Sequence, residues 1–286
     1  MAGLADSLNA QSGRFDALLR KERCGTEDLR EIVAVLRAPG GCPWDAAQTH
    51  LSIKKNFIEE TYEVVEALNL ADDALLREEL GDVLLQVALH CQMAAERGAF
   101  DWEQVTDGIC RKLIERHPHV FGDLRVQDAE QALRSWDAVK RRSKGQGTVA
   151  AAMEQVPREL PALMRATKLQ QKAARAGFDW PDVSGALDKL AEEVEELRTA
   201  IAEGGEAHCR DELGDVLFSA VNVSRFLPGC DAEEALTGAS EKFLRRFALV
   251  ERMAAEQGVD MKAAGLAELD RLWDIAKAGE NQDNNC

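Results

Sequence analysis

The sequence lacks the segments and motifs that define membrane proteins and several large enzyme classes. No apolar run is long enough to cross a bilayer, and the first residues contain no apolar signal core. The GxGxxG and Walker P-loop patterns are absent, and no Ser-His-Asp or Cys-His arrangement can be singled out. We therefore expect no membrane association, no dinucleotide-binding or P-loop domain, and no nucleophile-based catalysis.

The cysteines do not have the pattern of a disulfide framework or of a zinc site. The chain has seven, an odd and scattered set without a CxxC pair. This distribution indicates reduced thiols in a cytoplasmic protein rather than disulfides or a zinc site.

Positive charge is also in short supply. The sequence has 35 lysines and arginines against 51 acidic residues, a net charge of −16. A general nucleic-acid or membrane binder needs a basic face, so we expect neither function. The negative net charge does not exclude a small anionic substrate, provided that metal ions and a few local basic residues bind it.

Aromatic residues make up only 5% of the chain, and no convincing alternation of β-branched residues predicts a strand. Ala, Leu and Glu dominate, which is typical of helices. We therefore predict an all-α fold, and the length of 286 residues allows one to two domains.

The most informative stretch, Leu190–Phe218, carries two acidic pairs. Glu193 pairs with Glu196, and Glu212 pairs with Asp215. Each pair is three residues apart, so both side chains lie on one face of a helix. Gly204-Gly205 lies midway and predicts a turn. An antiparallel return at that turn would bring four carboxylates to one place.

A second copy of this pattern occupies Ile58–Leu84, with carboxylates at Glu60, Glu63, Glu79 and Asp82. Both copies have 19 residues from the first to the third carboxylate, and both end in Glu-Leu-Gly-Asp-Val-Leu. A solvated acidic face has no need to repeat such a register across a loop. The sequence therefore predicts an internal duplication, offset by 133 residues between Glu60 and Glu193.

Clustered carboxylates repel one another unless a cation lies between them. A site made only of carboxylate oxygens suits Mg²⁺, with Mn²⁺ as the alternative. None of these carboxylates is followed three residues later by histidine, so the Glu-x-x-His pattern of di-iron bundles is not met.

Each half also carries basic and aromatic residues after its acidic set. In the second half, Lys242 and Arg246 are four residues apart, as are Trp273 and Lys277. The first half has the same order in Lys112, Arg116, Trp136 and Lys140. Basic groups neutralise phosphate oxygens and tryptophan offers a flat face to a base or sugar, so the set favours a metal-bound polyphosphate. Helix-surface charge and one core tryptophan per half remain the simpler alternative.

Linker signals cluster at Ser143–Thr148, where glycine and polar residues interrupt the periodicity. The predicted organisation is a polar extension at 1–22, a helical domain at 23–142, a linker at 143–158, a second helical domain at 159–278 and a disordered tail at 279–286.

These residues resemble the MazG-type nucleoside triphosphate pyrophosphohydrolases in their long, two-repeat form. The resemblance covers about residues 26 to 278 and rests on GCPWD (41–45), EETYEV (59–64), EELGD (78–82), RHPHVF (116–121), LPALMRATK (160–168), GFDW (177–180), DELGD (211–215) and EKFLRRF (241–247). It implies an all-α fold of tandem helical repeats, each contributing to four-helix-bundle modules that a homodimer completes.

The resemblance also implies Mg²⁺-dependent hydrolysis of nucleoside or deoxynucleoside triphosphates to the monophosphate and pyrophosphate, in broad housekeeping or stress-related clearance. By motif match, the catalytic residues are Glu193, Glu196, Glu212, Asp215, Lys242 and Arg246, of which the four carboxylates bind the metal. Substrate would be bound by Lys168, Lys242, Arg246, Trp273 and Lys277. The first copy offers Glu60, Glu63, Glu79 and Asp82 as further metal ligands, but it has no match for the Lys168 segment.

Two alternatives stay open on the sequence. One is a narrow enzyme that cleaves dUTP or a modified deoxynucleotide, and the other is a non-catalytic, nucleotide-binding helical scaffold. The complete acidic set in both copies counts against the scaffold, because a scaffold has no need of a metal cage.

Overall fold

The computed structural model describes residues 18–143 and 148–283, and within these ranges it contains helices and loops but no β-strand. The predicted all-α fold is confirmed. Of the predicted segments, most of the extension at 1–22 and parts of the linker and the tail lie outside the described residues. The chain divides between Lys140 and Arg141 into two compact units, and each is considered by itself.

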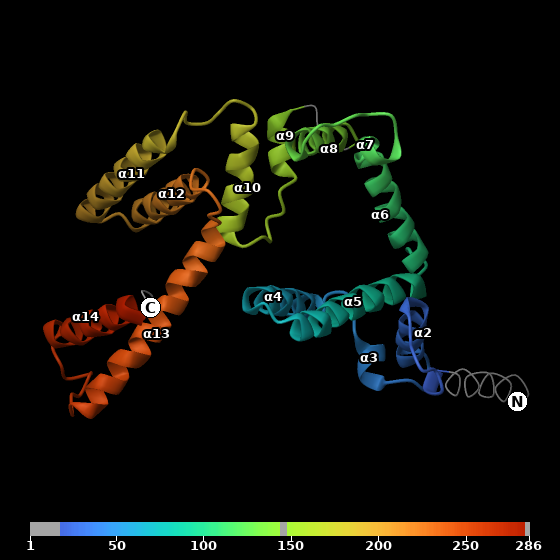
Figure 1. Cartoon of the computed structure of the whole chain (residues 1–286), viewed down its shortest axis with the longest axis horizontal. Helices are drawn as coiled ribbons and strands as arrows, with labels where there is room; N and C mark the ends of the chain where they lie inside the picture. The colour runs from blue at the N-terminus through green and yellow to red at the C-terminus, as the bar shows by residue number, and fades with distance from the viewer. Residues whose placement is uncertain (1–17, 144–147, 284–286) are drawn as a thin grey trace, which may run out of the picture. The chain divides into compact units, whose positions relative to one another are not determined.

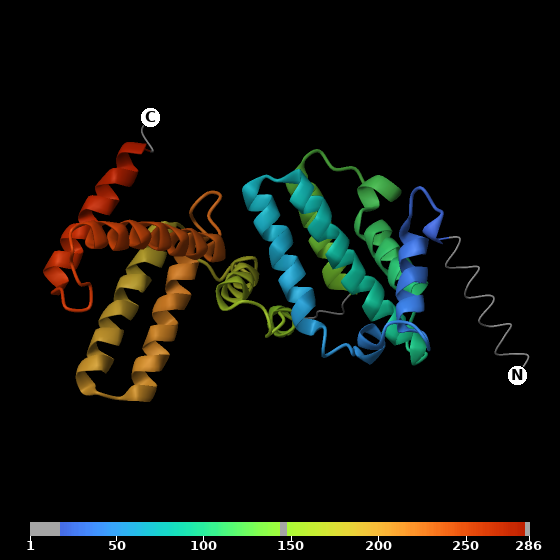
Figure 2. The ribbon, with the colours of Figure 1, turned by 90° about the horizontal axis from the view of Figure 1, so that it is seen from below.

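The first unit is built around a long helical hairpin, α4 and α5 (Figures 1 and 2). The helix α2 packs against α5, α3 packs against α2, and α6 packs against both α5 and α7. The bounds are α2 Thr26–Arg37, α3 Pro43–Ala47, α4 Lys54–Leu70, α5 Asp73–Glu96, α6 Trp102–Arg116, α7 Pro118–Phe121 and α8 Ala129–Ser143.

The second unit contains a corresponding hairpin, α11 and α12, with α10 packed against α12 (Figure 2). In both views, α13 and α14 form a further hairpin that lies apart from the turn between α11 and α12 (Figures 1 and 2). The bounds are α9 Val149–Glu154, α10 Ala162–Ala174, α11 Val183–Glu203, α12 Glu206–Ser224, α13 Ala232–Glu256 and α14 Leu266–Asp283. The helix α9 therefore occupies part of the segment expected as a linker.

Both acidic hairpins turn at equivalent positions. Ala71 ends α4 and Gly204 ends α11, each with a left-handed backbone, at φ 53° and 79°. Glycine adopts this conformation freely, whereas alanine is strained in it. The Asp72 side chain then accepts hydrogen bonds from the N–H groups of Ala74 and Leu75 and caps α5. The repeat thus reproduces its turn in space as well as its spacing in sequence.

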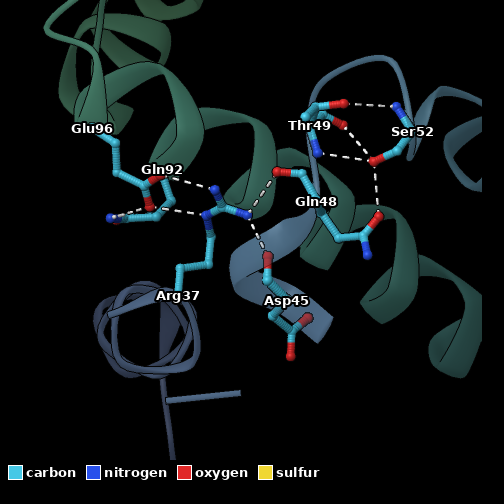
Figure 3. Close-up of polar contacts among 7 residues, drawn as sticks. All are labelled: Arg37, Asp45, Gln48, Thr49, Ser52, Gln92 and Glu96. Carbon is cyan, nitrogen blue, oxygen red and sulfur yellow. Dashed lines mark hydrogen bonds and ion pairs between the residues drawn. The ribbon is translucent and has the colours of Figure 1, made fainter. Parts of the chain in front are cut away.

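Arg37 links α3 and the residue that follows it, Gln48, to the end of α5 (Figure 3). The Arg37 guanidinium donates to both carboxylate oxygens of Glu96, at 2.9 and 2.8 Å. It also donates to the backbone carbonyls of Asp45 and Gln48. This contact fixes the segment that leads into α4, the helix carrying the first acidic pair.

Each unit has a small apolar core. In the first unit, α2 and α5 bury Val33, Ala88, Leu89 and Met93 together with Ile53. In the second, α13 and α14 bury Val250, Ala254, Leu272 and Ala276. Among the described helices, none combines the length and apolar character needed to cross a bilayer.

Candidate metal and nucleotide site

The second copy brings three of its four predicted carboxylates together. Glu193 and Glu196 on α11 and Glu212 on α12 each offer an oxygen within 4.8 Å of the others. Glu193 is buried at 6% exposure, Glu212 is half-buried and Glu196 is exposed. Asp215 lies one turn after Glu212 on α12, is exposed and is not part of this group.

Basic side chains already approach this group. The Lys189 ammonium lies 2.8 Å from a Glu193 carboxylate oxygen and 2.9 Å from one of Glu192. His208 Nδ1 lies 3.3 Å from Glu212. Burial raises the pKa of Glu196, Lys189 opposes this rise, and Glu193 adds to it by repulsion and hydrogen bonding. The net effect is a raised pKa of Glu196, because Lys189 does not offset burial and the neighbouring carboxylate.

The first copy forms a similar group. Glu60 on α4 and Glu79 and Asp82 on α5 are half-buried, with oxygens within 4.8 Å of one another. Burial raises the pKa of Glu60, and repulsion from Asp82 and Glu63 raises it further. Burial and then Glu63 raise the pKa of Glu79. Glu63 is thus electrostatically coupled to the group.

The donor set in both copies fits a hard divalent cation. Carboxylate oxygens are the ligands that Mg²⁺ and Mn²⁺ accept, and a cation relieves the repulsion that raises these pKa values. The residues that could hold a metal are therefore Glu193, Glu196 and Glu212 in the second copy, and Glu60, Glu79 and Asp82 in the first.

The predicted basic and aromatic residues of the second copy lie on the other hairpin. The Arg246 guanidinium lies 5.9 Å from the Trp273 ring centre, which also contacts Phe243. Lys242 and Lys277 are exposed. In the first unit, Trp136 lies between Arg116 and Lys140, at 5.2 and 4.5 Å from its ring centre. An arginine faces the predicted tryptophan in both halves, as a repeat requires.

Sequence reasoning missed a cavity of about 580 Å³ in the second unit. The helices α9, α10 and α12 and the loop before α11 line it, and it is open to solvent on one side; its walls include Met153, Leu169, Gln170, Phe178, Trp180, Phe218, Asn222 and Arg225. Lys168 is exposed on α10 and does not line it. A signal was present: Phe218, Asn222 and Arg225 continue the face of α12 that carries Asp215, at spacings of three, seven and ten residues.

Sequence reasoning also missed a histidine pair in the first unit. His50 Nδ1 and His90 Nδ1 are 2.7 Å apart, and the two rings stack with their centres separated by 5.1 Å. Burial first, and His50 second, lower the pKa of His90. The two residues are 40 positions apart, which is why no local motif indicated the contact.

Comparison with known proteins decides the family. The model of the MazG nucleotide pyrophosphohydrolase domain matches residues 48–121 and again 183–250. A nucleoside triphosphate pyrophosphohydrolase of Escherichia coli K12 is 42% identical over 257 residues, which cover 88% of this chain and 97% of that protein. The chain belongs to the MazG family.

Other relatives agree over similar lengths. The nucleoside triphosphate pyrophosphohydrolase/pyrophosphatase MazG of Thermotoga maritima is 42% identical over 254 residues, covering 89% of this chain and 96% of that protein. The uncharacterized protein YabN of Bacillus subtilis is 45% identical over 255 residues, 89% of this chain but 52% of that protein.

The two matched MazG segments contain the two acidic hairpins, so the predicted internal repeat is confirmed. The helices α9 and α10 and the loop at 177–180, which form much of the cavity, lie outside both segments.

Proposed function

We propose that this MazG protein hydrolyses nucleoside or deoxynucleoside triphosphates to the monophosphate and pyrophosphate, using a divalent metal held by the acidic hairpin of the second copy. The observation that carries the proposal is the group of Glu193, Glu196 and Glu212, whose oxygens lie within 4.8 Å of one another. The E. coli and T. maritima relatives, which are nucleoside triphosphate pyrophosphohydrolases, support the same reaction.

The chemistry divides between the metal and the chain. When bound, Mg²⁺ or Mn²⁺ polarises phosphoryl oxygens and lowers the pKa of a bound water. Glu193, Glu196 and Glu212 would hold the ion, and Asp215, exposed one turn after Glu212 on α12, is our candidate for a fourth ligand or for orienting water. The water oxygen bonds to the α-phosphorus, the bond to the bridging oxygen breaks, and pyrophosphate leaves.

Positive charge for the phosphates comes from two places in the second unit. Lys189 forms an ion pair with Glu193. When a cation binds Glu193, the Lys189 ammonium would become available to the phosphates of the substrate. Lys242, Arg246 and Lys277 neutralise charge on the leaving pyrophosphate, and Trp273 contacts the Arg246 guanidinium, 5.9 Å from its ring centre. We assign Lys168 a more peripheral contact with substrate, because it is exposed on α10.

We propose that a homodimer completes the site. The hairpin of α13 and α14 carries the basic residues but lies apart from the acidic turn, so a second copy offers a way to bring the two sets together (Figure 1). The acidic hairpin also exposes large apolar side chains, at Val194, Ile201, Leu213, Leu217 and Phe218. Exposed apolar faces of this size mark interfaces, and a dimer would bury them in a four-helix bundle.

The test compares two neighbouring carboxylates on α11. Glu193→Gln should abolish pyrophosphate release from deoxynucleoside triphosphates in Mg²⁺ and leave the helical circular dichroism signal intact. Glu195→Gln is the matched control, because Glu195 is exposed and pairs only weakly with Arg198 at 3.6 Å. A chelator should stop the wild type and added Mg²⁺ should restore it. Turnover in chelator, or equal loss in both variants, would contradict the assignment.

A further inference from the structure

Three residues that line the 580 Å³ cavity of the second unit each carry a buried side-chain polar atom without a hydrogen-bond partner. These atoms are Gln170 Oε1, Asn222 Oδ1 and Arg225 Nε, and each is enclosed by protein. Buried polar atoms without a partner are rare and cost free energy. Since all three residues line one cavity, a ligand there that turns these side chains toward itself would supply the missing partners.

The roles of these atoms are constrained by their neighbours. Gln170 Nε2 donates to the backbone carbonyl of Phe218 at 2.8 Å, so its Oε1 is left as an acceptor. Arg225 Nη2 donates to Asp179, which neutralises the guanidinium, and its Nε is a buried donor without a partner. The residues of the cavity wall therefore bring hydrogen-bonding groups but little net charge.

The rest of the wall is apolar and aromatic. Met153, Leu169 and Ala173 form its aliphatic side, and the rings of Trp180 and Phe218 provide flat surfaces. Such a mixture suits an uncharged, planar ring whose edge carries hydrogen-bond donors and acceptors.

The cavity continues the acidic face of α12. With a helical rise of 1.5 Å per residue, Phe218 lies about 5 Å past Asp215 and Asn222 about 10 Å past it, on the same side of the helix. A ligand whose phosphates meet the carboxylates would therefore extend its other end into the cavity.

In the first copy, core side chains occupy the corresponding positions. Under the offset of the repeat, Phe218 and Asn222 correspond to Leu85 and Leu89. Leu89 is 4% exposed and is packed with Val33 and Ile53, and Leu85 covers the same cluster. In the second unit, a cavity lies between α10 and α12. In the first unit, α2 packs against α5 at the corresponding positions, and apolar core side chains lie between these helices.

We propose that the cavity of the second copy binds the nucleobase of the substrate, that Gln170, Asn222 and Arg225 determine base preference, and that the first copy cannot bind a nucleoside. This rests on the proposed function, since it places the base relative to phosphates at the acidic hairpin. It adds the residues that recognise the base and a physical reason for the two copies to differ.

Two variants test the proposal by different routes. Asn222→Leu reproduces the residue of the first copy, and Ala173→Phe fills the cavity from α10. Asn69→Leu, on an exposed position of α4, is the matched control. Each would be assayed for kcat/KM with dATP, dGTP, dCTP and dTTP, for inhibition by pyrophosphate, and for thermal unfolding.

The proposal predicts that Asn222→Leu changes the ratios of kcat/KM among the four bases about three- to tenfold, the worth of one hydrogen bond. Ala173→Phe should lower all four values by tenfold or more. Inhibition by pyrophosphate, which has no base, should stay within twofold in both variants. Unchanged base ratios, or an equal loss of pyrophosphate binding in a folded variant, would overturn the proposal.

An inactive wild type would count against the proposed function rather than against the cavity. The cavity is then decided by calorimetry with the deoxynucleosides alone. Binding to wild type and to Asn69→Leu but not to Ala173→Phe supports the proposal, and absence of binding to wild type refutes it.

Discussion

Replacing Arg37 with methionine isolates the contact that holds α3 and Gln48 to α5. Methionine keeps the apolar stem but removes all four hydrogen bonds of the guanidinium, which is 6% exposed (Figure 3). The two bonds to backbone carbonyls contribute about 1 kcal/mol each. The two bonds to Glu96 would be stronger, but that side chain is 37% exposed and solvent screens them.

Together these terms predict a loss of about 2–4 kcal/mol in the free energy of unfolding, measured by urea denaturation. Arg111→Met is the control, since Arg111 and its partner Asp107 are both exposed, and its stability should not change measurably. A loss below about 1 kcal/mol for Arg37→Met would refute the view that the carbonyls of Asp45 and Gln48 depend on the guanidinium.

The same pair predicts a pH dependence. The Arg37 hydrogen bonds, opposed by burial, hold the pKa of Glu96 below its usual value. The stability from this pair is therefore complete above the unfolded-state pKa of about 4.3 and is lost as the pH falls through the folded-state pKa. The difference between wild type and Arg37→Met should shrink over that range.

Two further predictions concern the turn and the histidine pair. Ala71→Gly should stabilise the first unit by about 0.5–1 kcal/mol because it removes left-handed strain, whereas Gly204→Ala should destabilise the second by about 1 kcal/mol. Space does not limit Gly204→Ala, since nothing lies within 4 Å of the added Cβ. Changes of opposite sign in the free energy of unfolding, measured in urea, would support this prediction, and changes of the same sign would contradict it. His90 has a lowered pKa, so wild-type stability should fall as the pH drops through about 6.5, and less so in His90→Leu. Equal pH slopes for the two proteins would contradict this.

The hairpins could be predicted because their signals are local. The spacing of three residues within each acidic pair and the breaks at Ala71 and Gly204 are properties of single helices and turns, and the structure retains them. The start of α4 was harder to place. Its periodicity predicts a helix from about Thr49, but the side chains of Thr49 and Ser52 bond each other's backbone N–H groups and close a turn, so α4 begins at Lys54.

The cavity and the histidine pair could not be predicted, because they depend on contacts between distant segments. Gln170 meets α12 across 48 positions, and His50 meets His90 across 40. From the sequence, we likewise predicted that four carboxylates would meet in each copy. Helical phase alone does not show that Asp215 stays exposed and outside the group. Its distance from the Glu193 and Glu196 carboxylates depends on how α11 packs against α12.

The most direct test of the central claim is phosphorus NMR of deoxynucleoside triphosphate turnover in Mg²⁺ by wild type, Glu196→Gln and Glu63→Gln. We predict that wild type forms monophosphate and pyrophosphate, that Glu63→Gln retains this turnover, and that Glu196→Gln loses it while remaining folded. Release of diphosphate and inorganic phosphate by wild type, or full turnover by Glu196→Gln, would contradict a pyrophosphate-releasing site at the second acidic hairpin.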